Sequence, residues 1–191
     1  MAIKIYIDQG HNPRDFNTGA EGNGYYEQDI TYEVGIRLFD YLSQNPNFIP
    51  RLSRPTPDTV LGTSNSSSLT ERVRRANLWG ADVFISLHTN AAVNPAANGT
   101  EALIYSKEST VAFNLAEDIL RELTLVTGLK NRGIVERPGL YVLRRTRMPA
   151  VLVEMGFITN AQDAAFLSEH TNLFAEGIYN GILAYFALDV T

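Results

Sequence analysis

The sequence predicts an α/β fold, an open and mostly parallel (mixed) sheet of about six strands with helices on both faces. Short apolar runs of strand character alternate along the chain with segments whose apolar residues recur at helical spacing. Several of these runs are apolar at nearly every position, which is typical of strands that a parallel sheet buries on both faces. The chain of 191 residues is long enough for one domain with a sizeable core.

The N-terminal segments begin with a strand that ends near Gln9. Residues 9–26 are rich in glycine and asparagine and predict a long loop, a kind of segment that is usually functional in a compact domain. Apolar residues at helical spacing predict a helix over residues 29–42, which Asn45-Pro46-Asn47 ends. Residues 48–52 suit a second strand.

The middle of the chain continues the alternation. Ser68-Leu69-Thr70-Glu71 has the spacing of a capping box and predicts the start of a helix that Gly80 ends. The strand that carries His88 follows, and it leads into a polar loop over residues 90–100. Further strands are expected at 102–105, 140–143 and 150–154, and further helices at 110–127, 161–169 and 172–188.

Composition excludes several functions. A net charge of −5 and the absence of a basic patch argue against nucleic acid as a partner. With no cysteine, the chain has no disulfide framework, thiolate metal site or cysteine nucleophile. No apolar stretch of about 18 residues predicts a membrane span, and the first residues of the chain as given do not read as a signal peptide.

Two of the three histidines follow the same pattern. His11 and His88 each stand where an apolar strand ends, and parallel strands present ligands at their carboxyl ends. A lone histidine is more often a strand cap or a local hydrogen-bonding group, but two such positions favour a shared site. His170, in a predicted loop between helices, keeps the structural interpretation.

Two glutamates complete a candidate catalytic set. Glu27 stands just before a helical pattern, and together with His11 and His88 it would make a three-ligand zinc site of the catalytic kind. An acid in the first turn of a helix is also favourable without any metal, and Asp29 could equally serve that purpose. Glu154 ends the apolar run of residues 150–153, where a buried carboxylate needs a cation or a partner. A salt bridge to Arg144, Arg145 or Arg147 is the structural alternative.

The chain closely resembles the zinc-dependent N-acetylmuramoyl-L-alanine amidases of the Amidase_3 type. This family of bacterial cell-wall hydrolases includes autolysins, sporulation and germination amidases, and phage endolysins. The resemblance covers nearly the whole chain and rests on seven short motifs in order. They are Ile7-Asp8-Gln9-Gly10-His11, the glutamate of Tyr26-Glu27-Gln28-Asp29, residues 69–77, residues 84–91, Gly99-Thr100-Glu101, Asn131-Arg132-Gly133, and residues 149–160.

The resemblance implies an activity and a set of roles. His11, Glu27 and His88 would hold one Zn²⁺ per chain, and Glu154 would be the catalytic base. The bond expected to be cleaved joins the lactyl group of N-acetylmuramic acid to L-alanine in peptidoglycan. One departure is that Gln9 and Asn12 stand where the family usually has a small residue or proline and a glycine. This difference concerns the shape of the loop after the first strand.

Other expectations concern substrate and context. Asn90 and Arg132, each beside a motif, are candidates to bind the glycan or the stem peptide, with loop stabilisation as the alternative. We expect residues 1–191 to form a single catalytic amidase domain that acts in the cell wall or elsewhere outside the cytoplasm, aided by a wall-targeting domain or a partner protein. A zinc carboxypeptidase-like peptidase and an inactive peptidoglycan-binding module are the competing functions.

Overall fold

The computed structural model describes residues 2–189 and contains one large mixed sheet. Its strands are β1 (Ile3–Gln9), β4 (Phe48–Leu52), β5 (Val83–Asn90), β6 (Thr100–Ile104), β7 (Asn131–Glu136) and β8 (Ala150–Phe157). They lie in the order β4-β1-β5-β8-β6-β7. All neighbours are parallel except β6 and β8, which are antiparallel. The predicted sheet of about six strands is therefore confirmed.

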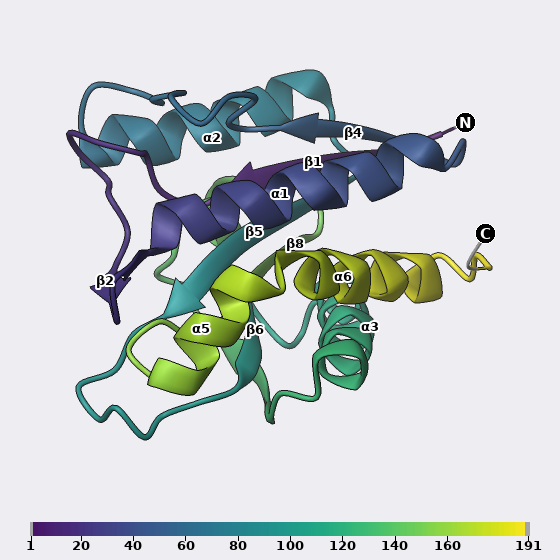
Figure 1. The fold of residues 1–191 in the computed structure, drawn as a ribbon. Helices are drawn as coiled ribbons and strands as arrows, with labels where there is room; N and C mark the ends of the chain where they lie inside the picture. Colours follow the sequence, from purple (N-terminus) through teal and green to yellow (C-terminus); the bar gives the residue numbers. More distant parts are fainter. Residues whose placement is uncertain (1, 190–191) are drawn as a thin grey trace.

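Helices cover both faces of this sheet. They are α1 (Glu27–Gln44), α2 (Asn65–Trp79), α3 (Thr110–Thr127), α4 (Tyr141–Arg145), α5 (Ala161–Glu169) and α6 (Thr171–Tyr185). In Figure 1, α1 and α6 lie side by side in front of the strands and α2 runs along the upper edge. The larger hydrophobic cluster includes buried residues of α1, α3 and α6, whereas α2 and α4 pack into a second cluster.

The alternation of side chains along the strands separates these two clusters. Ile5 and Ile7 of β1 belong to the cluster beneath α1, while Tyr6 between them belongs to the cluster beneath α2. Successive residues of a strand point to opposite faces, so Asp8 shares the face of Tyr6. On β8, Leu152 lies in the second cluster, and Glu154 therefore projects on that same face.

Several helix ends match the sequence signals. α3 spans residues 110–127 as predicted, and Gly128 ends it with a left-handed φ of 70°. The predicted capping box at Ser68 was wrong, because α2 begins earlier. Ser64 is its N-cap, and the reciprocal capping bonds join Ser64 to Ser67. Gly80 ends α2 with a φ of 66°, as expected.

Two segments differ from the prediction. Residues 140–143 were expected to form a strand, but most of this segment lies in the short helix α4. The strand of that region is β7, at residues where the sequence predicted none. It is an edge strand that is half-buried at best and pairs only with β6, so it lacks a continuous apolar run. A small hairpin of β2 (Glu21–Gly22) and β3 (Tyr25–Tyr26) lies within the predicted loop after β1.

A buried ion pair joins β1 to α2. Arg72 Nη1 lies 2.6 Å from Asp8 Oδ1, and both side chains are 1% exposed. Ser86 Oγ of β5 also donates to Asp8 Oδ2 at 2.9 Å. Burial acts to raise the pKa of Asp8, but the charge and hydrogen bonds of Arg72 outweigh it and lower that pKa. No helix among the described residues is long and apolar enough to cross a membrane.

Candidate metal centre and active site

His11, His88 and Glu154 meet near the carboxyl ends of the central strands of the sheet. His11 lies two residues beyond β1, His88 lies near the end of β5, and Glu154 lies on the neighbouring β8. Glu27 is the first residue of α1, and the N-terminus of this helix lies near the same ends of the strands (Figure 1). His88 and Glu154 are paired in the parallel register of β5 and β8, so their side chains share one face of the sheet.

Two imidazoles converge on one carboxylate oxygen. Glu27 Oε1 lies 3.1 Å from His11 Nε2 and 3.0 Å from His88 Nδ1. One ligand atom of each residue lies within 4.8 Å of those of the other two. The carboxylate is almost fully buried, while about a fifth of each histidine side chain is exposed, so the group opens toward solvent on the histidine side.

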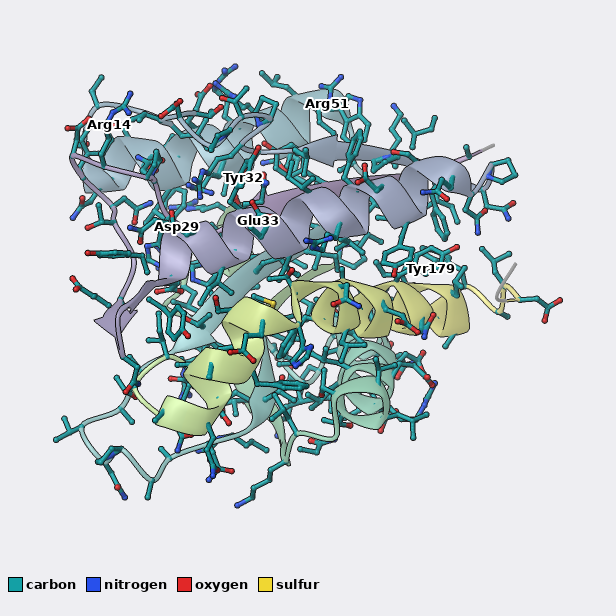
Figure 2. The ribbon with its side chains drawn as sticks, viewed as in Figure 1. Arg14, Asp29, Tyr32, Glu33, Arg51 and Tyr179 are labelled. Carbon is teal, nitrogen blue, oxygen red and sulfur yellow. The ribbon has the colours of Figure 1, made fainter. Side chains whose placement is uncertain are left out.

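Burial and hydrogen bonding fix the Glu27 carboxylate. Its Oε1 also accepts from the backbone N–H of Thr89 at 3.0 Å, and its Oε2 accepts from that of Ala20 at 2.8 Å. Burial acts to raise the pKa of Glu27, but hydrogen bonds from His11 and His88 hold it well below its usual range. Asp29, the alternative acid at this helix start, is exposed and lies on the outward side of α1 (Figure 2).

The backbone around His11 is unusual. His11 has a φ of 67°, a left-handed conformation that is uncommon for a residue with a side chain. Its carbonyl accepts from Arg72 Nη2, and its Nδ1 lies 3.3 Å from the carbonyl oxygen of Asn17. A proton on Nδ1 would satisfy that contact and leave Nε2 free to bind a cation. Gly10 has no side chain, and a Cβ there would lie 2.5 Å from the His88 ring.

Gln9 and Asn12, the two departures from the family pattern, tie the loop after β1 to the rest of the molecule. The Gln9 amide oxygen accepts from the backbone N–H of Arg54 at 2.8 Å. Asn12 is fully buried and exchanges two hydrogen bonds of 3.1 Å with the backbone of Leu61. Both residues therefore hold the ligand-bearing loop against the chain that follows β4.

Glu154 is half-buried, and its carboxyl group has no cationic partner among the described residues. Its Oε2 is buried and has no hydrogen-bond partner among the described residues. Burial raises its pKa to about 8, and the negative charges of Glu27 and Glu101 add to the rise. Arg144, Arg145 and Arg147 form no salt bridge with it in the described part of the chain. The structural alternative for Glu154 is therefore wrong.

The donor set fits a zinc ion. Two imidazole nitrogens and one carboxylate oxygen are a common set in catalytic zinc sites, where a fourth position stays open. The unpartnered oxygen of Glu154 and the mutual crowding of three nitrogen and oxygen donors both indicate that a positive charge belongs here. His170 lies apart from this group, at the junction of α5 and α6, with its ring packed 4.7 Å from that of Phe166.

Asn90 and Arg132 are brought together by Glu101, a residue of one of the motifs to which the sequence assigns no role. Glu101 accepts from Asn90 Nδ2 at 2.9 Å and lies 3.3 Å from Arg132 Nε. Arg132 also stacks 4.8 Å above the ring of Phe157 and donates to the carbonyl of Asn98. Since Asn90 Oδ1 accepts from Ala91, both ends of the Asn90 amide already have partners. No signal in the sequence identifies Glu101, because its place beside Glu154 follows from the antiparallel pairing of β6 with β8.

The chain is similar to a known protein family, to named relatives and to solved structures. A family model described as Amidase_3, N-acetylmuramoyl-L-alanine amidase, matches residues 5–184. The amidase CwlM of Bacillus licheniformis is 35% identical, over 97% of this chain and 70% of its own length. The amidase LytC of Bacillus subtilis strain 168 is 36% identical over 95% of this chain, which spans 35% of LytC. The crystal structure of N-acetylmuramoyl-L-alanine amidase from Clostridium difficile 630 superposes with a TM-score of 0.87 at 30% identity, covering 97% of each chain.

Proposed function

Because the chain belongs to the Amidase_3 family of N-acetylmuramoyl-L-alanine amidases, we propose that it cleaves the lactyl-alanine amide of peptidoglycan with zinc held by His11, Glu27 and His88. The observation that supports this most directly is the convergence of both histidines on Glu27, with the unpartnered carboxyl of Glu154 on the neighbouring strand. The chain is thus an amide hydrolase, and what we propose is its metal, its base and their division of labour.

The metal-binding residues each have a stated atom in this proposal. His11 offers Nε2, His88 offers Nδ1 and Glu27 offers Oε1, the atoms that already converge. When bound, zinc lowers the pKa of water and polarises a carbonyl oxygen. The chain contributes the fixed positions of these ligands, since backbone N–H groups hold both oxygens of Glu27.

Glu154 is the proposed general base. It takes the proton of the attacking water and then delivers that proton to the alanine nitrogen as the amide bond breaks. Burial raises the pKa of this carboxyl to about 8 in the metal-free chain, which suits it to holding the proton, and the positive charge of a bound zinc would favour the carboxylate form that accepts the proton. Such proton transfer typically contributes 10²- to 10⁴-fold to the rate.

Two variants test this division of roles. Glu154→Gln keeps the size of the side chain but cannot accept a proton, so zinc content should stay near one per chain while hydrolysis of peptidoglycan falls by orders of magnitude. Glu27→Gln should instead lose most of the zinc, because a neutral amide replaces the anionic ligand. Zinc lost from Glu154→Gln would place Glu154 among the ligands, and zinc retained by Glu27→Gln would remove Glu27 from them.

The competing functions give different products on purified peptidoglycan. An amidase releases new N-terminal alanine, a carboxypeptidase releases C-terminal residues, and an inactive module sediments with the wall without releasing either. A carboxypeptidase also needs a cation for the substrate carboxylate. Arg144 and Arg145 of α4 are candidates for that role. Arg132 is not, because it already forms a salt bridge with Glu101.

Substrate binding and targeting complete the proposal. Arg132 Nε contacts Glu101 and Nη1 contacts Asn98, whereas Nη2 has no partner among the described residues. We propose that Nη2 contacts the glycan or the stem peptide. Asn90 would act mainly by holding Glu101 in place. We further propose that residues 1–191 act as one catalytic domain in the cell wall or elsewhere outside the cytoplasm, and that a targeting domain or a partner protein brings it to peptidoglycan. This chain spans only about a third of LytC.

A further inference from the structure

A mostly apolar cavity has His11 and His88 in its lining, and its apolar wall has no role in the mechanism described above. Its volume is about 200 Å³. It lies between the sheet and helices α2 and α4, on the face that carries Glu154. The apolar wall consists of Leu69, Leu140, Tyr141, Val142 and Leu152.

The charged residues of the cavity are already paired. Asp8 and Arg72 both contact the cavity, but they bind each other at 2.6 Å and are 1% exposed. Arg72 also donates to the backbone carbonyls of Gln9 and His11. A ligand group that enters the cavity therefore meets apolar side chains on one side and the histidines on the other, with little unpaired charge.

Hydrogen bonds between α2 and α4 hold the cavity walls in place. Asn77 of α2 donates to the carbonyl of Arg145 and accepts from the backbone N–H of Arg147, both at 3.0 Å. Thr70 Oγ1 lies 3.4 Å from the Tyr141 hydroxyl. These contacts, together with the packing of Leu140 and Val142 in the second hydrophobic cluster, join the short helix α4 to α2. The cavity is thus part of the folded structure before a substrate binds.

We propose that this cavity receives a methyl group that flanks the scissile amide, and that it thereby makes the enzyme select for that methyl. The inference rests on the proposed function, because it uses the lactyl-alanine amide as the substrate. Two methyl groups flank this bond, one on the lactyl group and one on the alanine side chain. Gain or loss of one such carbon in an apolar pocket changes kcat/KM by about 10- to 200-fold.

The test compares three muramoyl-peptide substrates with the zinc-loaded wild-type chain. The parent carries both methyl groups, the second has glycine in place of alanine, and the third has a glycolyl in place of the lactyl group. We expect one of the two analogues to be cleaved with a kcat/KM at least about tenfold below that of the parent, and this identifies the methyl that binds. Values within about twofold for all three would overturn the proposal.

Wall variants show whether the cavity causes the selection. Leu69→Ala and Leu140→Ala remove half-buried walls and should each reduce the parent-to-analogue ratio to less than about threefold. Leu78→Ala, the same change at a position of α2 that is 73% exposed, should keep the wild-type ratio. All three should bind zinc as the wild type does. An undiminished ratio in every folded wall variant would overturn the proposal. Failure of the proposed function would look different, because the parent itself would then not be cleaved.

Discussion

Replacing Glu154 by glutamine should stabilise the metal-free protein, and the gain should increase with pH. In the unfolded chain the carboxyl ionises near its ordinary pKa of 4.5, whereas burial in the folded chain raises that pKa to about 8. Between these values the folded state binds a proton that the unfolded state has released. The free energy of unfolding therefore falls as pH rises through this range. Glutamine does not titrate, so the variant lacks this loss.

The size of the effect follows from the two pKa values. Each pH unit in this window changes the free energy of unfolding by 1.36 kcal/mol. From pH 5 to pH 8 the wild type should therefore lose about 3 kcal/mol relative to the variant. For a domain of this length such a difference corresponds to roughly 6–12 °C in Tm.

Thermal melts in the presence of a chelator at pH 5 and pH 8 measure this effect. Glu154→Gln should melt slightly above the wild type at pH 5 and well above it at pH 8. Glu117→Gln, at an exposed position of α3, is the matched control and should follow the wild type at both pH values. An equal Tm difference at pH 5 and pH 8, or a variant less stable than the wild type at pH 8, would show that the half-buried carboxyl of Glu154 does not stay protonated in the folded chain.

His88→Ala should bind far less than one zinc per chain, because His88 Nδ1 lies 3.0 Å from Glu27 Oε1, whereas His170→Ala should bind zinc as the wild type does, because His170 lies apart from this group. Elemental analysis of dialysed protein measures both, and equal contents would contradict the metal assignment. Arg72→Met should lower the free energy of unfolding at pH 7 by about 3–5 kcal/mol, because it leaves Asp8 charged, buried and unpaired; urea denaturation that shows less than about 1 kcal/mol would rule out this role. Residues 12–26 and 91–99 are expected to flank the metal site and to contact a polymer, so a muramoyl dipeptide should have a much lower kcat/KM than a longer glycan-peptide fragment. Equal values would show that these loops do not bind the polymer.

The sequence predicted best those elements whose ends carry local signals. α3 ends at a glycine in the left-handed region, and β4 is bounded as expected at residues 48–52. The segment after Gly139 was misjudged because a short apolar run suits a buried strand or one turn of helix equally well. β7 was missed because an edge strand with a left-handed glycine, Gly133, and exposed charges does not show the pattern of a buried strand.

The candidate site was predictable where one residue type at a strand end has a specific chemical meaning. His11, His88 and Glu154 stand at the ends of apolar runs in the sequence. In the structure these positions lie together near the carboxyl ends of neighbouring strands. The choice of Glu27 over Asp29 needed the resemblance, because either acid suits a helix start. Glu101 could not be assigned from sequence alone, since its role depends on pairing across β6, β7 and the end of β5.

The left-handed backbone of His11 bears on which ions the site can accept. This conformation costs about 1–3 kcal/mol, and contacts formed during folding maintain it, among them the hydrogen bond from Arg72 to the His11 carbonyl. In the proposed metal site the three candidate ligand atoms already lie close together, and these contacts would limit how far His11 can move when an ion binds. First-row metals prefer different coordination geometries, and ligands held in fixed positions cannot adopt all of them. At the proposed zinc site we therefore expect a shape set at folding to reduce the advantage of a more strongly binding ion such as Cu²⁺.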